Sequence, residues 1–489
     1  MDFFLFRVCM AVSKQIKAGI GYTVANVLVR GIGFVTLPIF ARLLSPADFG
    51  LYNIFMAYEG LLFCFIGFAL HSSLRSANIE YPGQIDNYTS SVSVIYLLNL
   101  LAMLCLAWVF REQLAALIGV SQAAVYLLVA GSFGGAVIEF YNCRIALQYN
   151  YKGYLAVALI SSLANVALAI LLILTVFDGE RYLGRVVAAA SVPFAVAAVL
   201  LVRFFIKARP SINWTFWKFG FMYSLPIVPH GMSQVVLGQV GRIMIQHMVS
   251  IAAAGIYSLA ANLMSIVVIL VGSVSTVWTT WFYDTLAAPG DIQGKGKTIQ
   301  ARARVLLLGS AFVSIGLMGI APELVLVLGG EAYREATYSA YGMILCGECV
   351  FAYNLICAGE YYKKKTIYIF LGTVLAAALS VIFNFVGIRL FGYIAVAYTT
   401  LLAYCCYVVF HWVICRHLMG ISVIPLSTSV KIVAVLGIAL VADWLLTDRL
   451  IVRWLVTVGL LTMVAWPIVR ERGGFKTILA TVFQFTKNK

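Results

Sequence analysis

A single arginine, Arg30, interrupts the first long apolar stretch of the chain, NVLVRGIGFVTLPIFA. On a helix, the residues that share the face of Arg30 are Thr23, Asn26, Gly33 and Leu37. An arginine that faces lipid at the centre of a bilayer costs about 2.5–3.5 kcal/mol. We therefore expect Arg30 and Asn26 to line a substrate or ion pathway. The alternative is an ion pair that only links two helices.

A second polar group lies in the stretch FMYSLPIVPHGMSQVVLGQVGRIMIQHM. Pro226 and Pro229 lack backbone donors, so we expect a bent or broken helix here. His230, Gln234 and Arg242 are candidates for substrate binding in the same stretch. The alternative for His230 is a histidine packed in the core, and the alternative for Arg242 is a guanidinium that reaches the membrane surface.

Two acidic residues, Glu59 and Glu348, fall near the middle of long apolar stretches. Glu59 could neutralise Arg30 when the site is empty, and either acid could carry a coupling proton. A structural hydrogen bond is an equal alternative for each of them. Glu139 and Arg144 fall nearer the end of their apolar stretch, where we expect the charged heads to reach the membrane surface.

The composition places these polar residues in a membrane. Hydrophobic residues make up 63% of the chain and charged residues 11%, whereas soluble domains are about 45–50% apolar and about 25% charged. The net charge of +15 does not indicate nucleic acid, because the basic residues lie between apolar stretches as topology signals. The sequence contains no metal-ligand cluster, nucleotide-binding loop or nucleophile triad, so no cofactor and no metal are expected.

Fourteen stretches reach the roughly 20 mostly apolar residues that a spanning helix needs, so the chain is predicted to be an all-α polytopic membrane protein. The spans are expected near 20–42, 51–71, 89–110, 123–144, 155–177, 184–206, 221–248, 255–282, 303–328, 338–358, 367–388, 392–415, 429–446 and 450–469. Most Lys and Arg residues flank the ends that put both termini in the cytoplasm. The longest loop, residues 283–302, is expected on that side, and the outer loops are short.

A short internal repeat divides these spans into two sets. LSPADFGLY, which ends at Tyr52, aligns with VSIAAAGIY, which ends at Tyr257, and Ser, Ala, Gly and Tyr match at the same positions in both. Each copy joins the first two spans of a six-span set, which predicts two parallel six-helix lobes, a transporter architecture. In the first copy, Pro46 and Gly50 are expected to set the outer turn, and Asp48 is expected to cap the second span.

The repeat and the spans together predict the organisation of the chain. The expected parts are a cytoplasmic or interfacial N-terminal tail at 1–19, an N-lobe at 20–206, a cytoplasmic linker at 207–220, a C-lobe at 221–415, a C-terminal helix pair at 429–469 and a cytoplasmic C-terminal tail at 470–489.

The motifs RGIGF, PIFARLLSP and DFGLY, which follow one another over residues 30–52, resemble the opening of the polysaccharide flippases. These are the O-antigen and exopolysaccharide repeat-unit transporters of the multidrug/oligosaccharidyl-lipid/polysaccharide (MOP) superfamily. A second motif, GRIMIQHM, followed by AGIY, resembles the start of that family's second lobe. There an Asp–Arg pair is usual, whereas this chain has Gly241 and Arg242. The resemblance implies a MATE-like fold.

The resemblance implies a flippase, not an enzyme. It would move undecaprenyl-diphosphate-linked oligosaccharides from the cytoplasmic to the periplasmic leaflet of a bacterial inner membrane by alternating access. Arg30 would then grip the diphosphate through charge-assisted hydrogen bonds. The expected partners are the lipid-linked oligosaccharide, membrane lipids, H⁺ or Na⁺ as coupling ion, and a polysaccharide polymerase with its chain-length regulator, but no nucleic acid.

Two alternatives share this fold: an ion-coupled multidrug exporter and a flippase for the peptidoglycan lipid precursor. Arginines in the cavity disfavour the exporter, because a cation carrier would favour acids there. A membrane-bound polysaccharide polymerase or ligase is disfavoured because the outer loops are too short for a catalytic domain.

Overall fold

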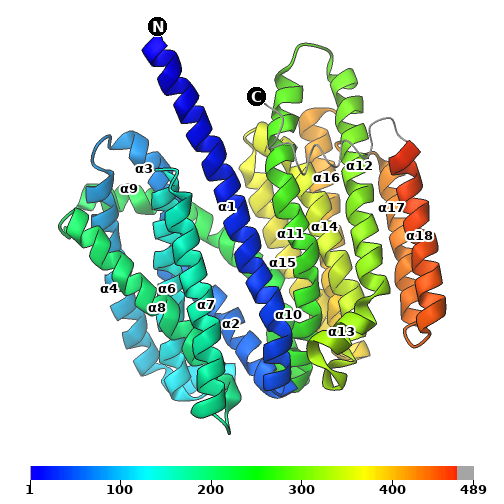
Figure 1. Cartoon of the computed structure of the whole chain (residues 1–489), viewed down its shortest axis with the longest axis horizontal. Coiled ribbons are helices and arrows are strands. Elements are labelled where there is room, and N and C mark those ends of the chain that lie inside the picture. The colour runs from blue at the N-terminus through cyan, green and yellow to red at the C-terminus, as the bar shows by residue number, and fades with distance from the viewer. Residues whose placement is uncertain (1, 471–489) are drawn as a thin grey trace. The chain divides into compact units, whose positions relative to one another are not determined.

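The computed structural model describes residues 2–470, and in that range every regular element is a helix (Figure 1). Residues 471–489, which make up nearly all of the predicted C-terminal tail, lie outside the described residues. Residues 2–19 of the predicted N-terminal tail continue the first helix, α1, which runs from Asp2 to Leu43.

Thirteen of the described helices are long and apolar enough to cross a membrane, which confirms the all-helical polytopic fold. In the first half they are α1, α2 (Pro46–Gly67), α4 (Ile85–Val109), α6 (Gln122–Ala146), α7 (Tyr151–Thr175) and α8 (Arg181–Lys207). In the second half they are α11 (Ile251–Ala287), α12 (Ile292–Gly319), α14 (Ala336–Tyr362), α15 (Thr366–Phe391), α16 (Ala395–Met419), α17 (Leu426–Leu445) and α18 (Leu450–Arg470).

The remaining predicted span, near 221–248, is broken in the structure. It consists of α9 (Trp214–Ser224), a 3₁₀ turn η2 (Leu225–Ile227) and α10 (Val228–Met248). The break falls at Pro226, which confirms the prediction of an interrupted helix. Helix α10 carries several polar side chains, and it is not among the thirteen described helices that are long and apolar enough to cross a membrane.

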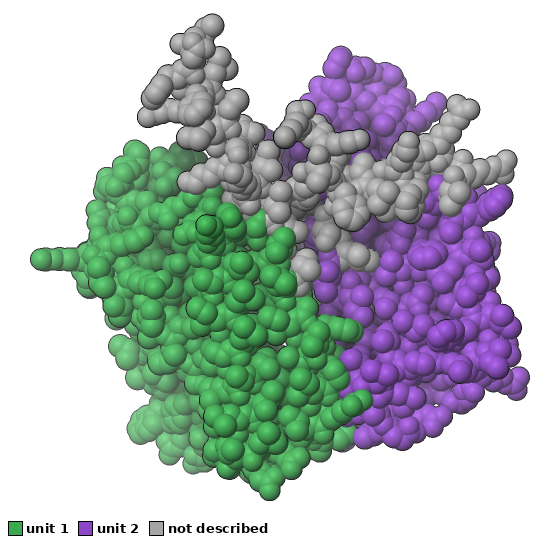
Figure 2. All heavy atoms as spheres, in the orientation of Figure 1, with its two compact units in different colours: residues 1–239 green, residues 240–489 purple. Residues whose placement is uncertain are grey.

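The chain divides into two compact units between Gln239 and Val240, within α10 (Figure 2). In unit 1, α6 packs on α2, α4 and α8, and α7 packs on α8 and α1. The contact between α6 and α8 requires a glycine, because a Cβ on Gly134 of α6 would lie 2.5 Å from the Pro193 carbonyl carbon of α8. Shorter elements complete the unit: η1 (Leu70–Ser73), α3 (Leu74–Glu80) and α5 (Arg111–Ile118).

Unit 2 repeats this arrangement. Its central helix, α14, packs on α11, α12 and α16, and α15 packs on α16. The second, fourth and sixth spans of each half therefore form the same chain of contacts, as α2–α6–α8 in unit 1 and as α11–α14–α16 in unit 2. The C-terminal pair, α17 and α18, packs on α12, near the short helix α13 (Ala321–Gly329) and the turn η3 (Glu331–Tyr333). Two six-helix sets plus a helix pair are thus confirmed.

The repeated turn keeps its capping residue, but the predicted residue is wrong. Ser45, not Asp48, is the N-cap of α2, and its Oγ accepts a hydrogen bond from the Asp48 N–H at 3.1 Å. The matching Ser250 caps α11 by accepting from the Ala253 N–H at 3.1 Å. Asp48 lies in the first turn, where its carboxylate accepts from the Ser45 hydroxyl at 2.6 Å.

The predicted loop at 283–302 is also wrong. Helix α11 continues to Ala287 and α12 begins at Ile292, so only residues 288–291 connect them. The new helix starts where Asp291 caps it, with a carboxylate that accepts from the Gly294 N–H at 2.8 Å. The apolar part of a sequence shows which portion of a helix can lie in the membrane, whereas the capping residues show where the helix itself begins or ends.

Residues 207–220, predicted as a linker, are bonded to α4 of unit 1. Ser90 Oγ donates to the Ala208 carbonyl at 2.8 Å, and the Asn213 N–H donates to Ser91 Oγ at 3.2 Å. The Trp217 indole N–H donates to the Ser91 carbonyl at 3.0 Å. This segment is therefore part of the first unit. That residues 20–206 and 221–415 act as the two lobes during transport stays a prediction.

Candidate functional site

Arg30 and Asn26 lie one turn apart on α1, on the face that packs against the start of α7. The Tyr154 hydroxyl of α7 donates to Asn26 Oδ1 at 2.6 Å, and its ring meets the Tyr22 ring edge-on at a centroid distance of 5.2 Å. The Arg30 side chain is exposed, and its charge acts on the Tyr154 hydroxyl. Unit 1 therefore presents a cation and two hydrogen-bonding groups together.

Glu139 of α6 lies near the same tyrosine. Its charge acts on Tyr154, and its Oε1 accepts a weak hydrogen bond from Cys143 Sγ at 3.8 Å. The side chain is partly buried and belongs to this group of polar residues, and the expectation that its charged head reaches the membrane surface stays a prediction. We call Asn26, Arg30, Glu139 and Tyr154 the α1–α7 polar cluster.

His71, in η1 outside the spanning helices, adjoins the cluster through Glu139. Burial lowers the pKa of His71, and the neighbouring Glu139 carboxylate opposes this effect without cancelling it. The imidazole is therefore neutral near neutral pH. The positive charge of the cluster then comes from Arg30, since His71 adds none.

Arg144 forms an ion pair at the end of α6, and its expected extension to the membrane surface stays a prediction. Its guanidinium lies 2.6 Å from Asp86 Oδ1, and the arginine side chain is 7% exposed. The pair joins the end of α6 to the start of α4. A buried arginine needs such a partner, because its desolvation is costly.

Glu59 is not paired with Arg30 in the part of the chain that the structure describes. Its Oε1 lies 2.8 Å from the position that a Cβ on Gly131 of α6 would occupy. Its Oε2 is buried and has no hydrogen-bond partner among the described residues. Glu59 is thus an unpartnered acid at the contact between α2 and α6, and the pairing with Arg30 stays a prediction.

The first half of α10 lies along α2, where Val235 comes within 3.3 Å of a Cβ placed on Gly60. His230 is half-buried, with no hydrogen-bond partner for Nδ1 in the described range, and Gln234 is exposed. Both belong to unit 1 together with Arg30, Asn26 and Glu59.

Arg242 belongs to unit 2, where its Nε donates to the Ser258 hydroxyl of α11 at 3.2 Å. The preceding Gly241 is packed so tightly that a Cβ would lie 2.9 Å from Val396 Cγ1 and 3.1 Å from the Tyr257 hydroxyl. The aspartate that is usual in the resembling family would not fit here. Packing therefore explains the departure from that family's pattern.

Glu348, also in unit 2, is 5% exposed and accepts two hydrogen bonds from α12. Ser310 Oγ donates to Oε1 at 2.7 Å and Ser314 Oγ donates to Oε2 at 3.0 Å. Each carboxyl oxygen thus has a partner. This geometry matches the structural alternative for Glu348, and the role as a proton carrier is not tested by it.

Sequence reasoning missed three polar side chains with distant partners. The Arg185 guanidinium stacks over the rings of Phe40 and Tyr52 at 4.0 and 4.7 Å. Arg453 is buried against Glu323, and His411 is buried against Glu360. Arg185 and Arg453 each lie close to a turn of the chain, where an arginine is interpreted as a topology signal. No neighbouring residue in the sequence identifies their partners.

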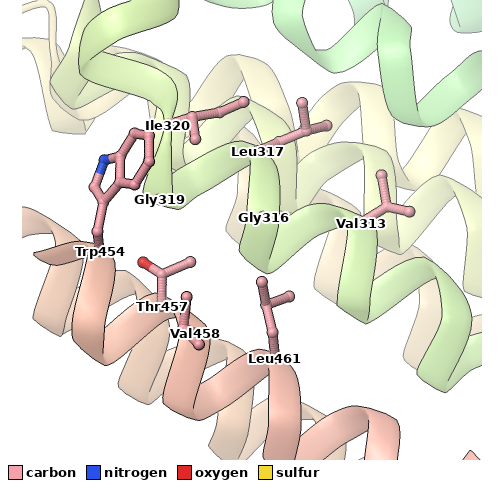
Figure 3. A pocket seen from close by; sticks show the side chains of 9 residues that line it. All are labelled: Val313, Gly316, Leu317, Gly319, Ile320, Trp454, Thr457, Val458 and Leu461. Carbon is pink, nitrogen blue, oxygen red and sulfur yellow. The ribbon is translucent and has the colours of Figure 1, made fainter.

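One pocket of about 390 Å³ lies between α12 and α18 (Figure 3). The view shows the side chains of Val313 and Leu317 on one helix facing those of Trp454, Val458 and Leu461 on the other. Its wall is almost wholly apolar, so it suits hydrocarbon and not a charged head group. Within residues 2–470, no three His, Cys, Asp or Glu side chains are placed to hold a metal ion.

Known proteins resemble the chain in both sequence and fold. Residues 16–285 match the family described as "Polysaccharide biosynthesis protein". The succinoglycan biosynthesis transport protein ExoT of Rhizobium meliloti (strain 1021) is 25% identical over 336 residues, which cover 66% of this chain and 64% of that protein. The match therefore spans somewhat less than two thirds of that relative.

Two solved structures share the fold at low sequence identity. The lipid II flippase MurJ, in an inward closed conformation, has a TM-score of 0.65 at 15% identity and covers 92% of this chain and 99% of its own. A multidrug resistance MATE family transporter of the MOP superfamily, in an inward-facing conformation, has a TM-score of 0.61 at 11% identity and covers 79% of this chain and 94% of its own. The family match covers more than half of the sequence, so the chain belongs to the polysaccharide biosynthesis protein family, and it has the MATE/MurJ-like fold.

Proposed function

We propose that this protein is a flippase for undecaprenyl-diphosphate-linked oligosaccharides in surface polysaccharide biosynthesis. It moves them from the cytoplasmic to the periplasmic leaflet by alternating access of two six-helix lobes. The observation that carries the proposal is the α1–α7 polar cluster, in which the exposed arginine and the amide of α1 lie near the phenol of Tyr154 on α7 and the partly buried carboxylate of Glu139 on α6. Membership of the polysaccharide biosynthesis family supports the substrate class.

The chemistry of the cluster suits a diphosphate. A guanidinium offers several N–H donors in a fixed fork, which match two phosphate oxygens at once. Asn26 can donate through its amide nitrogen while its oxygen is held by Tyr154. Arg242, Gln234 and His230 are proposed as further contacts for the sugar or the phosphates, with Glu59 or Glu348 as coupling groups.

The proposed location is the inner membrane of a bacterium, with both termini in the cytoplasm. The Lys and Arg distribution supports the orientation, and the bacterial relative supports the compartment. The proposed partners are the lipid-linked oligosaccharide, surrounding lipids, H⁺ or Na⁺, and a polysaccharide polymerase with its chain-length regulator.

Two rival functions share the fold. A cation exporter is disfavoured, because the exposed charge of the cluster on α1 is positive. A flippase for the peptidoglycan precursor also carries a diphosphate, so the cluster alone does not separate it from the proposal. Rescue of cells depleted of the precursor flippase would favour that rival, and resistance to cationic drugs would favour the exporter.

The test replaces Arg30 in cells that depend on this gene for surface glycan. Arg30→Ala should abolish surface glycan, with the lipid-linked unit retained on the cytoplasmic leaflet, and Arg30→Lys should restore part of it because the charge remains. Arg111→Ala is the matched control, since Arg111 contacts the nearby Trp108, whose carbonyl accepts a hydrogen bond at 3.1 Å and whose ring lies 5.8 Å from the guanidinium. Normal glycan from a well-expressed Arg30→Ala protein would refute the role of the cluster.

A further inference from the structure

A histidine and a glutamate are buried together in unit 2. His411 Nδ1 of α16 lies 2.6 Å from Glu360 Oε1 of α14, and both side chains are 0% exposed. Two further atoms of the pair, Glu360 Oε2 and His411 Nε2, are buried without a hydrogen-bond partner in the described chain. Unpartnered polar atoms are rare in packed interiors, so this pair needs an explanation.

The surroundings of the pair are aromatic and uncharged. The His411 ring lies 4.7 Å from the Tyr407 ring and 4.9 Å from the Tyr353 ring. Its Nε2 points at Gly372 of α15, where a side chain would collide with it. The titratable groups that face Glu360 are all neutral in their usual forms: Cys357 and Tyr361 from α14, and Tyr407 and Cys415 from α16.

The charge balance of the pair depends on one proton. With one proton shared, the pair is neutral overall, either as carboxylate and imidazolium or as carboxylic acid and imidazole. Loss of that proton leaves a net negative charge, and a second proton leaves a net positive charge, without a counterion among the described neighbours. Either change is costly in an apolar interior, so it requires the site to open to water.

The position of the pair allows such an opening. Glu360 lies three residues before Lys363, about 4.5 Å along the helix axis. The run Lys363–Lys365 marks this end of α14 as the predicted cytoplasmic end. Because α14 and α16 are neighbouring central helices of unit 2, exposure of the pair requires a change in their packing.

We propose that Glu360 and His411 form a proton-binding site, which exchanges a proton with the cytoplasmic side when the contact between α14 and α16 opens. The proton enters at Glu360 Oε2 or His411 Nε2, the two atoms left without partners. If the proposed function holds, this proton is the coupling ion of transport. The opposing view is a permanent hydrogen bond that only joins the two helices.

The test follows the carboxyl carbonyl band of the purified full-length protein by infrared spectroscopy from about pH 5 to about pH 9. A proton-binding site predicts a titrating band that Glu360→Gln removes and that His411→Asn moves to a different midpoint. Glu360→Asp keeps an ionisable group and should retain the band with a shifted midpoint, which guards against a misfolded Gln variant. Glu112→Gln, which changes an exposed acid of α5, is the control and should leave the band unchanged.

A wild-type spectrum with no titration assignable to Glu360 would overturn the proton site, whatever the protein transports. The link to transport has its own readout, surface glycan in cells, where Glu360→Gln should lose export and Glu112→Gln should not. If the wild-type protein shows the titrating band but Glu360→Gln still exports glycan fully, the coupling role is overturned and the proton-binding site is retained. Full export by Arg30→Ala would overturn the proposed function and leave the infrared result standing.

Discussion

A buried arginine is one of the residues that hold the C-terminal helix pair to the rest of unit 2, and its removal should loosen that pair. Arg453 of α18 is 1% exposed, and its Nε donates to the Gly319 carbonyl at 3.0 Å. Its other nitrogens bond the Thr447 carbonyl and the Glu323 carboxylate. We predict that Arg453→Met destabilises the protein, because the remaining partners lose their donors.

The size of the effect follows from burial. Removal of one partner of a buried ion pair costs about 3–5 kcal/mol, mainly because the other charge is left unpaired. The Glu323 side chain is 34% exposed, so water can solvate its freed carboxylate. The cost should therefore fall near the lower limit, about 3 kcal/mol. Methionine retains most of the apolar volume of arginine, so cavity formation adds little.

The assay is reversible unfolding of the purified protein in mixed detergent micelles, with the free energy of unfolding compared between variants. Arg334 provides the matched control, since it is exposed and pairs with Glu331 at 2.9 Å and with Asp448 at 3.1 Å. Exposed pairs contribute little, so Arg334→Met should leave the unfolding transition unchanged. Equal effects of the two substitutions, or none for Arg453→Met, would refute the reasoning from burial.

Two further predictions concern packing and pH. Gly241→Asp should lower the yield of folded protein, because its Cβ would press on Val396. Gly238→Ala should be tolerated, since no atom lies within 4 Å of a Cβ placed there. Equal yields of the two variants would contradict this account. The pKa of His71 is lowered in the folded state, so the unfolded state binds a proton first as the pH falls below about 6.5. Stability should therefore fall as the medium is acidified from that pH, and His71→Gln should reduce the loss in the same micelle assay; an unchanged pH dependence would argue against this.

The helices were predictable because hydropathy and proline act locally. The break at Pro226 follows from a missing backbone donor, and it falls where the sequence places it. The N-cap of α2 was harder, because Ser45 and Asp48 are both good capping residues and only the geometry decides between them. The connection at 288–291 was missed because a helix can continue beyond its apolar part.

The site was predictable only in part, because its partners come from distant positions. The stripe of Asn26 and Arg30 is visible in the sequence, since residues four apart share a helix face. Tyr154 lies 128 residues beyond Asn26, and nothing local identifies it as a neighbour. The Glu360–His411 pair, separated by 51 residues, was missed for the same reason.

The bonds between residues 207–220 and α4 bear on how the protein is made. A chain released from the ribosome as far as the end of α8 still lacks the segment that occupies Ser90 and Ser91 of α4. The first half of the molecule therefore completes its interior only when α9 and the start of α10 have emerged. Two separately expressed halves that reconstitute the protein should accordingly be divided at the Val249–Ser250 turn, after the broken helix and not before it.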